Sequence, residues 1–135
     1  NTIFAKYGIK FHYTGMQNVA DVREFVNEKT KLIWVETPTN PMMNIIDIEE
    51  IAKIAKESNA LLAVDNTFAT PYLQNPLDMG ADIVMHSVTK YLGGHSDVVM
   101  GALVCNNRKI AEEIYRIQNS SGAVTGPMDS FAETL

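Results

Sequence analysis

The chain has 135 residues, of which 46% are hydrophobic and 20% charged, and its formal net charge is −5 at pH 7. This length suits one domain with a real core, is small for a complete cofactor enzyme, and has an ordinary globular composition. The negative charge, mixed along the chain, argues against a nucleic-acid partner, because phosphate binding needs a basic patch. No run is long enough for a membrane span, no signal peptide opens the chain, and the single Cys105 cannot form an internal disulfide. We therefore expect a cytoplasmic protein without membrane contact.

Hydrophobic spacing, β-prone runs and turn residues predict the elements in chain order. The chain begins with the end of an element closed by Gly8, followed by a strand at 9–13, a helix at 19–27 and a strand at 32–35. A helix that starts at 47–50 and ends near 58–59 comes next, then a strand at 61–64 and a short helix around 73–79. Strands at 83–85 and 101–105, a helix at 109–118 and a turn or linker at 126–127 complete the prediction.

Strands that alternate with helices form βαβ units with short right-handed crossovers. The predicted fold class is therefore α/β, with a mainly parallel sheet and helices on both faces. Asp47 with Glu50 three residues later has the pattern of a capping box and supports the helix start at this point.

Polar residues follow three of the predicted strands, in segments 36–40, 65–67 and 87–90. Ligands of open α/β sheets bind at the carboxyl ends of the strands, so these segments are expected to meet at one crevice. Local explanations stay open for each of them. Asn40 between prolines can be a turn residue, Asp65 can form an Asx turn, and the hydroxyls of Ser87 and Thr89 can cap the following turn.

Lys90 follows a buried strand and precedes the pair Gly93-Gly94. A desolvated lysine can lose its proton near neutral pH and attack a carbonyl to form a Schiff base, whereas most lysines after strands are solvated surface charges. Together the three segments supply what pyridoxal phosphate needs. Its aldehyde takes a lysine, its ring nitrogen takes an acidic partner, and its phosphate takes small donors.

Three motifs carry a resemblance to a known family. Segment 64–68 reads Val-Asp-Asn-Thr-Phe, segment 87–97 reads Ser-Val-Thr-Lys-Tyr-Leu-Gly-Gly-His-Ser-Asp, and segment 36–41 reads Glu-Thr-Pro-Thr-Asn-Pro. The chain resembles, over about 9–131, the Cys/Met metabolism family of pyridoxal-phosphate enzymes. That family includes cystathionine γ-synthase, the cystathionine γ- and β-lyases and methionine γ-lyase, with the aspartate-aminotransferase-like fold (fold type I).

The resemblance implies roles for six residues. Lys90 would bind the cofactor covalently and shuttle protons as the catalytic residue, Asp65 would pair with the ring nitrogen, Asn40 would hydrogen-bond the ring hydroxyl, Ser87 and Thr89 would contact the phosphate, and Thr67 would sit against the ring. No metal is expected. The remaining motif residues are given supporting or structural roles: Glu36, His95 and Asp97 as support or scaffold, His12 and His86 as structural, and Trp34 with the methionines as core.

The resemblance further implies that residues 1–135 are the central part of the large cofactor domain. The family's stacking tyrosine, phosphate loop and neighbour-subunit pair lie upstream of this sequence, and its carboxylate-binding arginine lies downstream. The whole enzyme would be a homo-oligomer, a dimer or tetramer, that acts on amino-acid substrates, and the isolated piece is expected to be inactive. Two alternatives stay open, a non-catalytic α/β interaction module and a doubly wound nucleotide binder. The second lacks a glycine-rich loop after the first strand.

Overall fold

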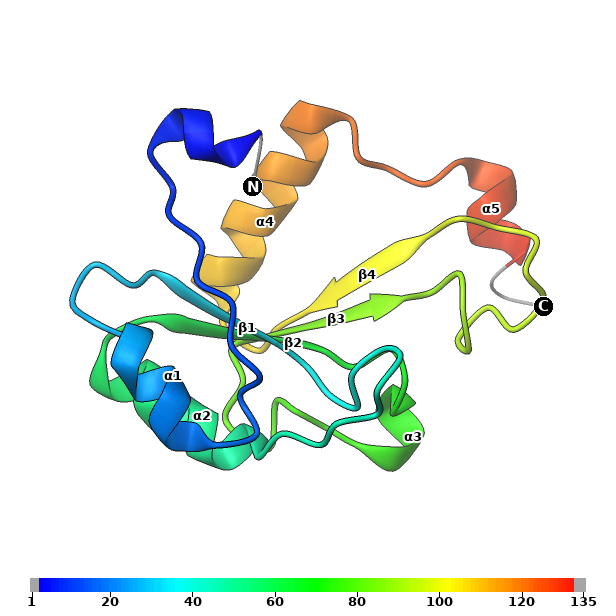
Figure 1. Cartoon of the computed structure of the whole chain (residues 1–135). Coiled ribbons are helices and arrows are strands. Elements are labelled where there is room, and N and C mark those ends of the chain that lie inside the picture. Colours follow the sequence, from blue (N-terminus) through cyan, green and yellow to red (C-terminus); the bar gives the residue numbers. More distant parts are fainter. Residues whose placement is uncertain (1–2, 133–135) are drawn as a thin grey trace.

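A computed structural model describes residues 3–132. Its centre is a four-stranded sheet with strand order β1-β2-β3-β4 (Figure 1). The strands are β1 (Leu32–Glu36), β2 (Leu61–Asp65), β3 (Ile83–Ser87) and β4 (Gly101–Val104), and the helices are the 3-10 helix η1 (Phe4–Tyr7), α1 (Val19–Phe25), α2 (Ile48–Glu57), α3 (Thr70–Leu73), α4 (Arg108–Ser121) and α5 (Pro127–Ala132).

The sheet is mainly parallel. β1 pairs with β2 and β2 with β3 in parallel register, whereas β4 runs antiparallel to β3. The predicted α/β class is thereby confirmed. Because three neighbouring strands run in one direction, their carboxyl ends lie along one edge, with Glu36 beside Asp65 and Asp65 beside Met85.

The hydrophobic core lies between one face of the sheet and the helices α1 and α2. Alternate residues of the strands point into it, as the two-residue period of a strand requires. Its buried members include Ile33 and Val35 of β1, Leu62 and Val64 of β2, Val84 of β3, Val22 of α1, and Ile48, Ile51, Ile54 and Ala55 of α2.

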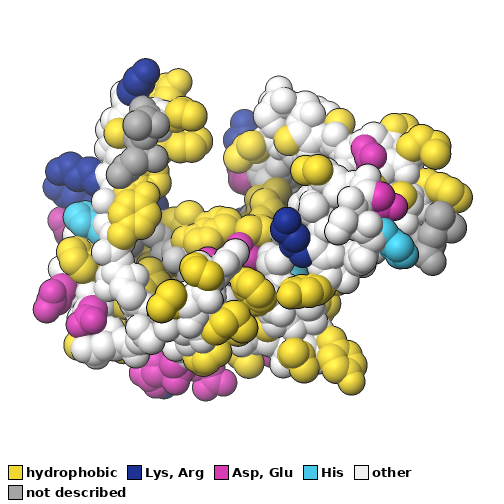
Figure 2. Space-filling view, turned by 45° about the vertical axis from the view of Figure 1, so that its right-hand side comes forward, with side chains coloured by type: hydrophobic (Ala, Val, Ile, Leu, Met, Phe, Trp, Pro, Cys, Tyr) yellow, Lys and Arg dark blue, Asp and Glu magenta, His cyan; other side chains and the backbone are white. Residues whose placement is uncertain are grey.

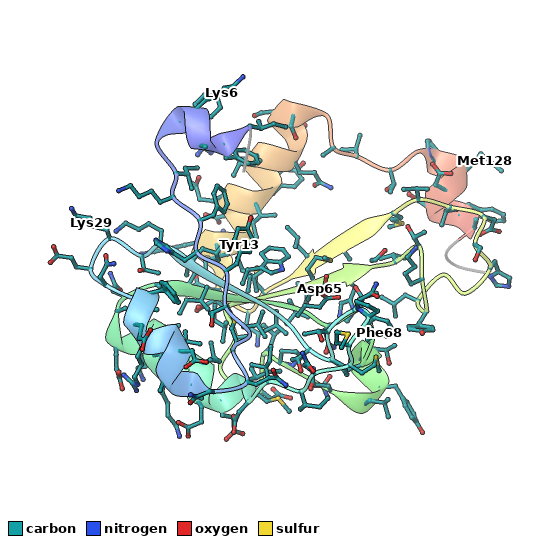
Figure 3. The ribbon with its side chains drawn as sticks, viewed as in Figure 1. Lys6, Tyr13, Lys29, Asp65, Phe68 and Met128 are labelled. Atoms are coloured by element: carbon teal, nitrogen blue, oxygen red, sulfur yellow. The ribbon has the colours of Figure 1, made fainter. Side chains whose placement is uncertain are left out.

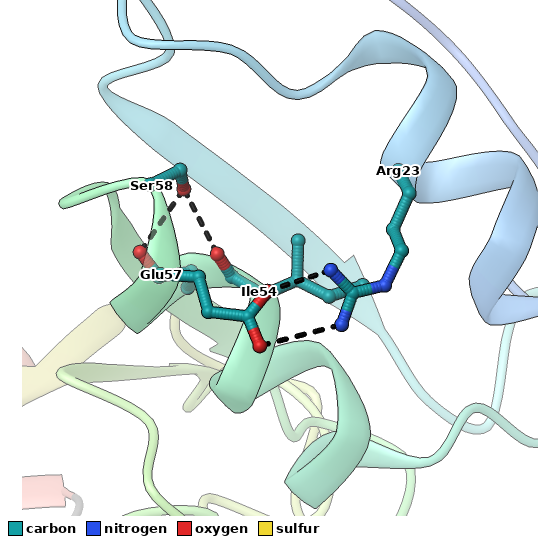
Figure 4. A network of polar contacts seen from close by, with 5 residues as sticks. Arg23, Ile54, Glu57 and Ser58 are labelled. Carbon is teal, nitrogen blue, oxygen red and sulfur yellow. Dashed lines mark hydrogen bonds and ion pairs between the residues drawn. The ribbon is translucent and has the colours of Figure 1, made fainter.

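Helix α2 begins where the sequence predicts. The Asp47 side chain accepts a hydrogen bond from the Glu50 backbone N–H at 3.1 Å and caps the helix. At the other end, the Ser58 hydroxyl bonds the carbonyls of Ile54 and Ala55, and Arg23 of α1 forms a two-point ion pair with Glu57 (Figure 4). Both charged side chains are exposed, so this pair contributes little stability beside the core.

Core packing on α2 gives a first testable prediction. Ile51 is completely buried, and replacing it by alanine should cost about 2–5 kcal/mol through lost transfer energy and a residual cavity. Ile45 is 69% exposed, and the same substitution there should change stability by less than about 0.5 kcal/mol. Urea unfolding of both variants measures the difference, and equal losses would contradict this description of the core.

The second face of the sheet is much more open. Trp34 of β1 is 46% exposed and Leu103 of β4 is 49% exposed. Figure 2 shows a hollow in the molecule with hydrophobic side chains on its floor. Helix α4 rises on the side away from α1 and α2 (Figure 1), but none of its residues is buried. Trp34 is therefore not a core residue of the described chain, contrary to the prediction, because its face of the sheet has no closely packed cover there.

Three local predictions differ from the structure. Segment 9–13 is not a strand, since it pairs with no described strand. The short helix predicted around 73–79 is found earlier in the chain, at Thr70–Leu73. Most of the predicted range forms turns instead. The predicted linker at 126–127 instead begins α5, with Pro127 as its first residue, a position that proline favours in helices. No described helix is both long and apolar enough to cross a membrane.

Candidate functional site

The polar segments that follow β1, β2 and β3 meet at the carboxyl edge of the sheet. Asp65 is the last residue of β2 (Figure 3), and Ser87 is the last residue of β3. The Thr67 hydroxyl joins them. It donates to Asp65 Oδ1 at 2.6 Å and accepts from the Ser87 backbone N–H at 2.8 Å. Asp65, Thr67 and Ser87 therefore form one connected unit across two strands.

The two oxygens of the Asp65 carboxylate differ. Oδ1 accepts from both the backbone N–H of Thr67, at 3.0 Å, and the Thr67 hydroxyl. The first of these contacts is the Asx turn that the sequence left open. Within the described residues, Oδ2 accepts no hydrogen bond from the protein. The local turn thus orients the carboxylate and leaves one oxygen for another partner.

Lys90 lies in the turn that follows β3. Its backbone N–H bonds the Ser87 carbonyl at 3.1 Å, and its own carbonyl accepts from Gly94 at 2.8 Å. Gly94 has a φ of 76°, a left-handed conformation that favours glycine. The Lys90 side chain is exposed and forms no hydrogen bond or ion pair with any described residue. The turn therefore holds the lysine backbone firmly and leaves its amine available.

The Thr89 hydroxyl is used within the protein. It donates to the Met100 carbonyl at 3.1 Å and accepts from the Met100 backbone N–H at 2.8 Å. Its only proton is thereby committed, whereas the hydroxyl of Ser87 has no hydrogen-bond partner within residues 3–132. Of the two predicted phosphate contacts, Ser87 is the one with a free donor.

Asn40 lies in the loop after β1. Its side chain is exposed and has no hydrogen-bond partner in the described part of the chain. The loop itself is ordered by its threonines, since the Thr39 hydroxyl accepts from the Asn44 N–H at 2.9 Å and the Thr37 hydroxyl accepts from the Ile46 N–H at 3.0 Å. Asn40 and Lys90 thus follow the two strands that flank β2, and within the described residues neither forms a hydrogen bond or ion pair with Asp65.

A buried polar cluster behind this edge is absent from the sequence predictions. Asn66 is completely buried, Thr37 is 1% exposed, and both contact the side-chain amide of Gln74. Asn66 and Thr37 stand in two of the motifs that carry the family resemblance, but neither residue was given a role there. Gln74 lies in an irregular segment, and no motif or spacing marks it.

His86 of β3 is buried beneath the site and points to the core side of the sheet. Its Nδ1 has no hydrogen-bond partner among the described residues. Desolvation by burial lowers the pKa of His86, and the nearby charge of Asp65 opposes this shift only in part. The imidazole is therefore neutral at pH 7, as expected of a structural histidine.

The lowered pKa of His86 predicts a pH-dependent stability. The folded state binds this proton less well than the unfolded chain, so stability is complete above the ordinary histidine pKa of about 6.5 and falls as the pH decreases below it. Urea midpoints measured from pH 7 to pH 5 should decrease, and the decrease should be smaller in His86→Gln. The exposed His12 provides the control, because His12→Gln should keep the wild-type slope. An unchanged slope in His86→Gln would refute the assignment.

The free groups at this edge fit pyridoxal phosphate. They comprise one carboxylate oxygen, one hydroxyl, one side-chain amide and one amine, contributed by Asp65, Ser87, Asn40 and Lys90. These are the groups that a ring nitrogen, a phosphate, a ring hydroxyl and an aldehyde require. The fold is of the α/β class, and the edge is a candidate ligand site at its strand ends.

Comparison with known proteins identifies the family. The model of the Cys/Met metabolism PLP-dependent enzymes matches residues 1–134, so the chain belongs to this family, whose cofactor is pyridoxal phosphate. The chain is 53% identical over 129 residues to a cystathionine beta-lyase of Lactococcus lactis subsp. cremoris, covering 96% of this chain and 34% of the relative. It is 52% identical over 126 residues to a cystathionine gamma-synthase/O-acetylhomoserine (thiol)-lyase of Bacillus subtilis, covering 93% and 34%.

A solved structure agrees with the fold. The cystathionine gamma-lyase of Lactobacillus plantarum, complexed with L-serine, superimposes with a TM-score of 0.95 at 41% identity, covering 98% of this chain and 35% of that one. The chain thus spans about a third of the length of these relatives. The mainly parallel sheet is therefore the arrangement found in the family.

Proposed function

We propose that this chain forms the cofactor-binding part of a pyridoxal-phosphate enzyme that acts on sulfur amino acids by β- or γ-elimination or by γ-replacement. The observation that carries the proposal is the family match over residues 1–134 together with the convergence of Asp65, Thr67 and Ser87 at one strand edge, next to the turn of Lys90. The named relatives include both lyases and a synthase, so the substrate is proposed as a class.

Each residue has a proposed task toward the cofactor. The free Oδ2 of Asp65 pairs with the ring nitrogen, and Thr67 orients that carboxylate and packs against the ring. The Asn40 amide bonds the ring hydroxyl. Ser87 donates its hydroxyl to the phosphate. Thr89 remains a proposed phosphate contact, and its hydroxyl also holds the adjoining backbone through Met100. Lys90 Nζ is the covalent attachment point.

Lys90 is also the proposed proton carrier. Bound pyridoxal phosphate acts as an electron sink for the carbanion that forms at a substrate carbon. That carbanion would form when a base takes the proton from the carbon, and the same base would afterwards return the proton to another substrate atom. The Lys90 amine is the group of the set that could do both. Asp65 maintains the protonated ring nitrogen, because a nearby negative charge raises the pKa of a cation.

The assembly and compartment are proposals of the same kind. A homo-oligomer, a dimer or tetramer, is supported by the open second face of the sheet, where Trp34 and Leu103 are exposed. A cytoplasmic location is supported by the lone Cys105, which has no disulfide partner.

Borohydride trapping tests the proposal. The protein is incubated with pyridoxal phosphate, its yellow absorption band is recorded, and borohydride then fixes the cofactor before peptide mapping. We expect the label on Lys90 alone. Labelling of Lys53, Lys56 or Lys109, or the absence of any absorption band, would refute the proposed function.

A further inference from the structure

Two side-chain amides, of which Asn66 is completely buried and Gln74 half-buried, link two of the strand-end loops. We propose that Asn66 and Gln74 are positioning residues that hold the loop of Asn40 in register with Asp65. The inference rests on the proposed function, since it assigns Asn40 and Asp65 to one bound cofactor. The pair itself contacts neither the cofactor-binding groups nor Lys90, so its effect would be indirect.

The contacts run in both directions between the two residues. Asn66 Nδ2 donates to the backbone carbonyl of Gln74 at 2.9 Å, and Gln74 Nε2 donates to Asn66 Oδ1 at 2.7 Å. Gln74 Nε2 also donates to the carbonyl of Thr37 at 3.2 Å. One side chain thus bridges the segment after β1 and the segment after β2.

Each end of this bridge lies close in sequence to a site residue. Thr37 begins the loop that carries Asn40, and its hydroxyl accepts from the Ile46 N–H, which closes the base of that loop. Asn66 stands between Asp65 and Thr67, and its backbone N–H bonds the Met85 carbonyl of β3 at 2.9 Å. A shift of Gln74 would therefore move the Asn40 loop relative to a carboxylate that the sheet keeps in place.

The polar nature of the pair supports positioning over simple packing. Asn66 is completely buried and Thr37 nearly so, a location where apolar side chains would fill space without directional contacts. Buried hydrogen bonds are costly to leave unmade, so the three bonds of this network favour one arrangement of the two loops. A cofactor bound from several loops needs its contacts held within about 0.5 Å, which such a network can provide.

The substitution Gln74→Met tests the inference, because methionine has a similar length without the amide. Gln118→Met is the matched control, since Gln118 is exposed on α4 and its side chain has no partner in the described chain. Hydrogen exchange is measured first, without cofactor. The backbone N–H groups of Asn44 and Ile46 should exchange about tenfold faster in Gln74→Met, because loss of the bridge loosens their loop.

The cofactor readouts follow on the complete protein loaded with pyridoxal phosphate. We expect about tenfold weaker cofactor binding in Gln74→Met, the lower end of what supporting contacts behind a bound group contribute. We also expect a shift in the pH at which the visible absorption of the bound cofactor changes, because Asn40 would no longer be held at the ring hydroxyl. If Gln74 only stabilised the fold, the pH at which the cofactor absorption changes would be the same in Gln74→Met as in the wild type. Gln118→Met should match the wild type in every measurement.

The possible outcomes separate the two proposals. If the wild type does not bind the cofactor at Lys90, the proposed function fails and this inference fails with it. If it does bind, and Gln74→Met has the wild-type affinity and absorption profile, Asn66 and Gln74 are structural only and the positioning role is wrong. Should Gln74→Met not fold, Gln74→Asn provides the same comparison, because its shorter side chain keeps the amide but cannot span both contacts.

Discussion

Replacing Lys90 by alanine in the complete protein should lower the release of 2-oxo acid from cystathionine or methionine by about 100- to 10,000-fold, the range typical of a positioned acid–base group. The physical reason is that one amine would supply both the attachment point and the proton carrier. The Lys90 amine has no ion pair with any residue of the described range 3–132, whereas Lys53 pairs with Glu50 on α2, on the core side of the sheet.

Two measurements check the effect of Lys90→Ala. Turnover is followed by 2-oxo acid release, and borohydride treatment followed by mass measurement reports whether the cofactor is still fixed to the chain. Lys109→Ala is the control, because this exposed lysine lies at the start of α4. Turnover of Lys90→Ala within tenfold of the wild type would exclude Lys90 from both tasks.

The elements with strong periodicity could be predicted from sequence. The buried runs of β1, β2 and β3 and the Asp47 cap of α2 lie where propensity and capping agree with the tertiary structure. Segment 9–13 is different, since its β-prone residues pair with no described strand. Propensity creates a strand only where a partner edge is available, and that depends on contacts that are distant in the sequence.

The burial of the sheet was predicted less well. Trp34 was predicted to lie in the core, but in β1 only Ile33 and Val35 are buried, while Leu32 and Trp34 are exposed. Composition reports what a strand is able to bury, whereas the cover on each face comes from other segments. The same reasoning applies to α4, which is strongly amphipathic in sequence and yet has no buried residue.

Only the residues proposed to contact the cofactor could be predicted from the sequence, and the contacts that support them could not. Asp65, Ser87 and Lys90 were recognisable because their residue types follow strands and occur together in motifs. The Thr67 bridge and the Asn66–Gln74 pair were not, because each depends on which loops approach one another in space. The roles of the six predicted site residues toward a cofactor stay predictions, and the experiments on Lys90 and Asp65 test the two central ones.

Asp65→Asn should separate catalysis from cofactor retention. Asparagine keeps an oxygen that can accept both hydrogen bonds from Thr67, so the local turn is preserved. It removes the negative charge proposed to pair with the ring nitrogen. An opposite charge within about 4–6 Å of a titrating group shifts the pKa of that group by about 1–3 units. Without the Asp65 charge, the protonated fraction of the ring nitrogen, and with it turnover, should therefore fall about 10- to 1,000-fold.

Cofactor binding should change much less in this variant, because the contacts from Ser87, Asn40 and Lys90 remain. Asp78→Asn, at an exposed carboxylate in the turn before β3, is the matched control and should behave as the wild type in both assays. Asp65→Ala extends the series, since it also releases Thr67 and should weaken cofactor binding further than Asp65→Asn. Normal turnover in Asp65→Asn would remove the Asp65 charge from the mechanism. A parallel loss of binding and turnover would instead mean that this carboxylate acts chiefly in holding the cofactor, and that its free oxygen does not control the state of the ring nitrogen.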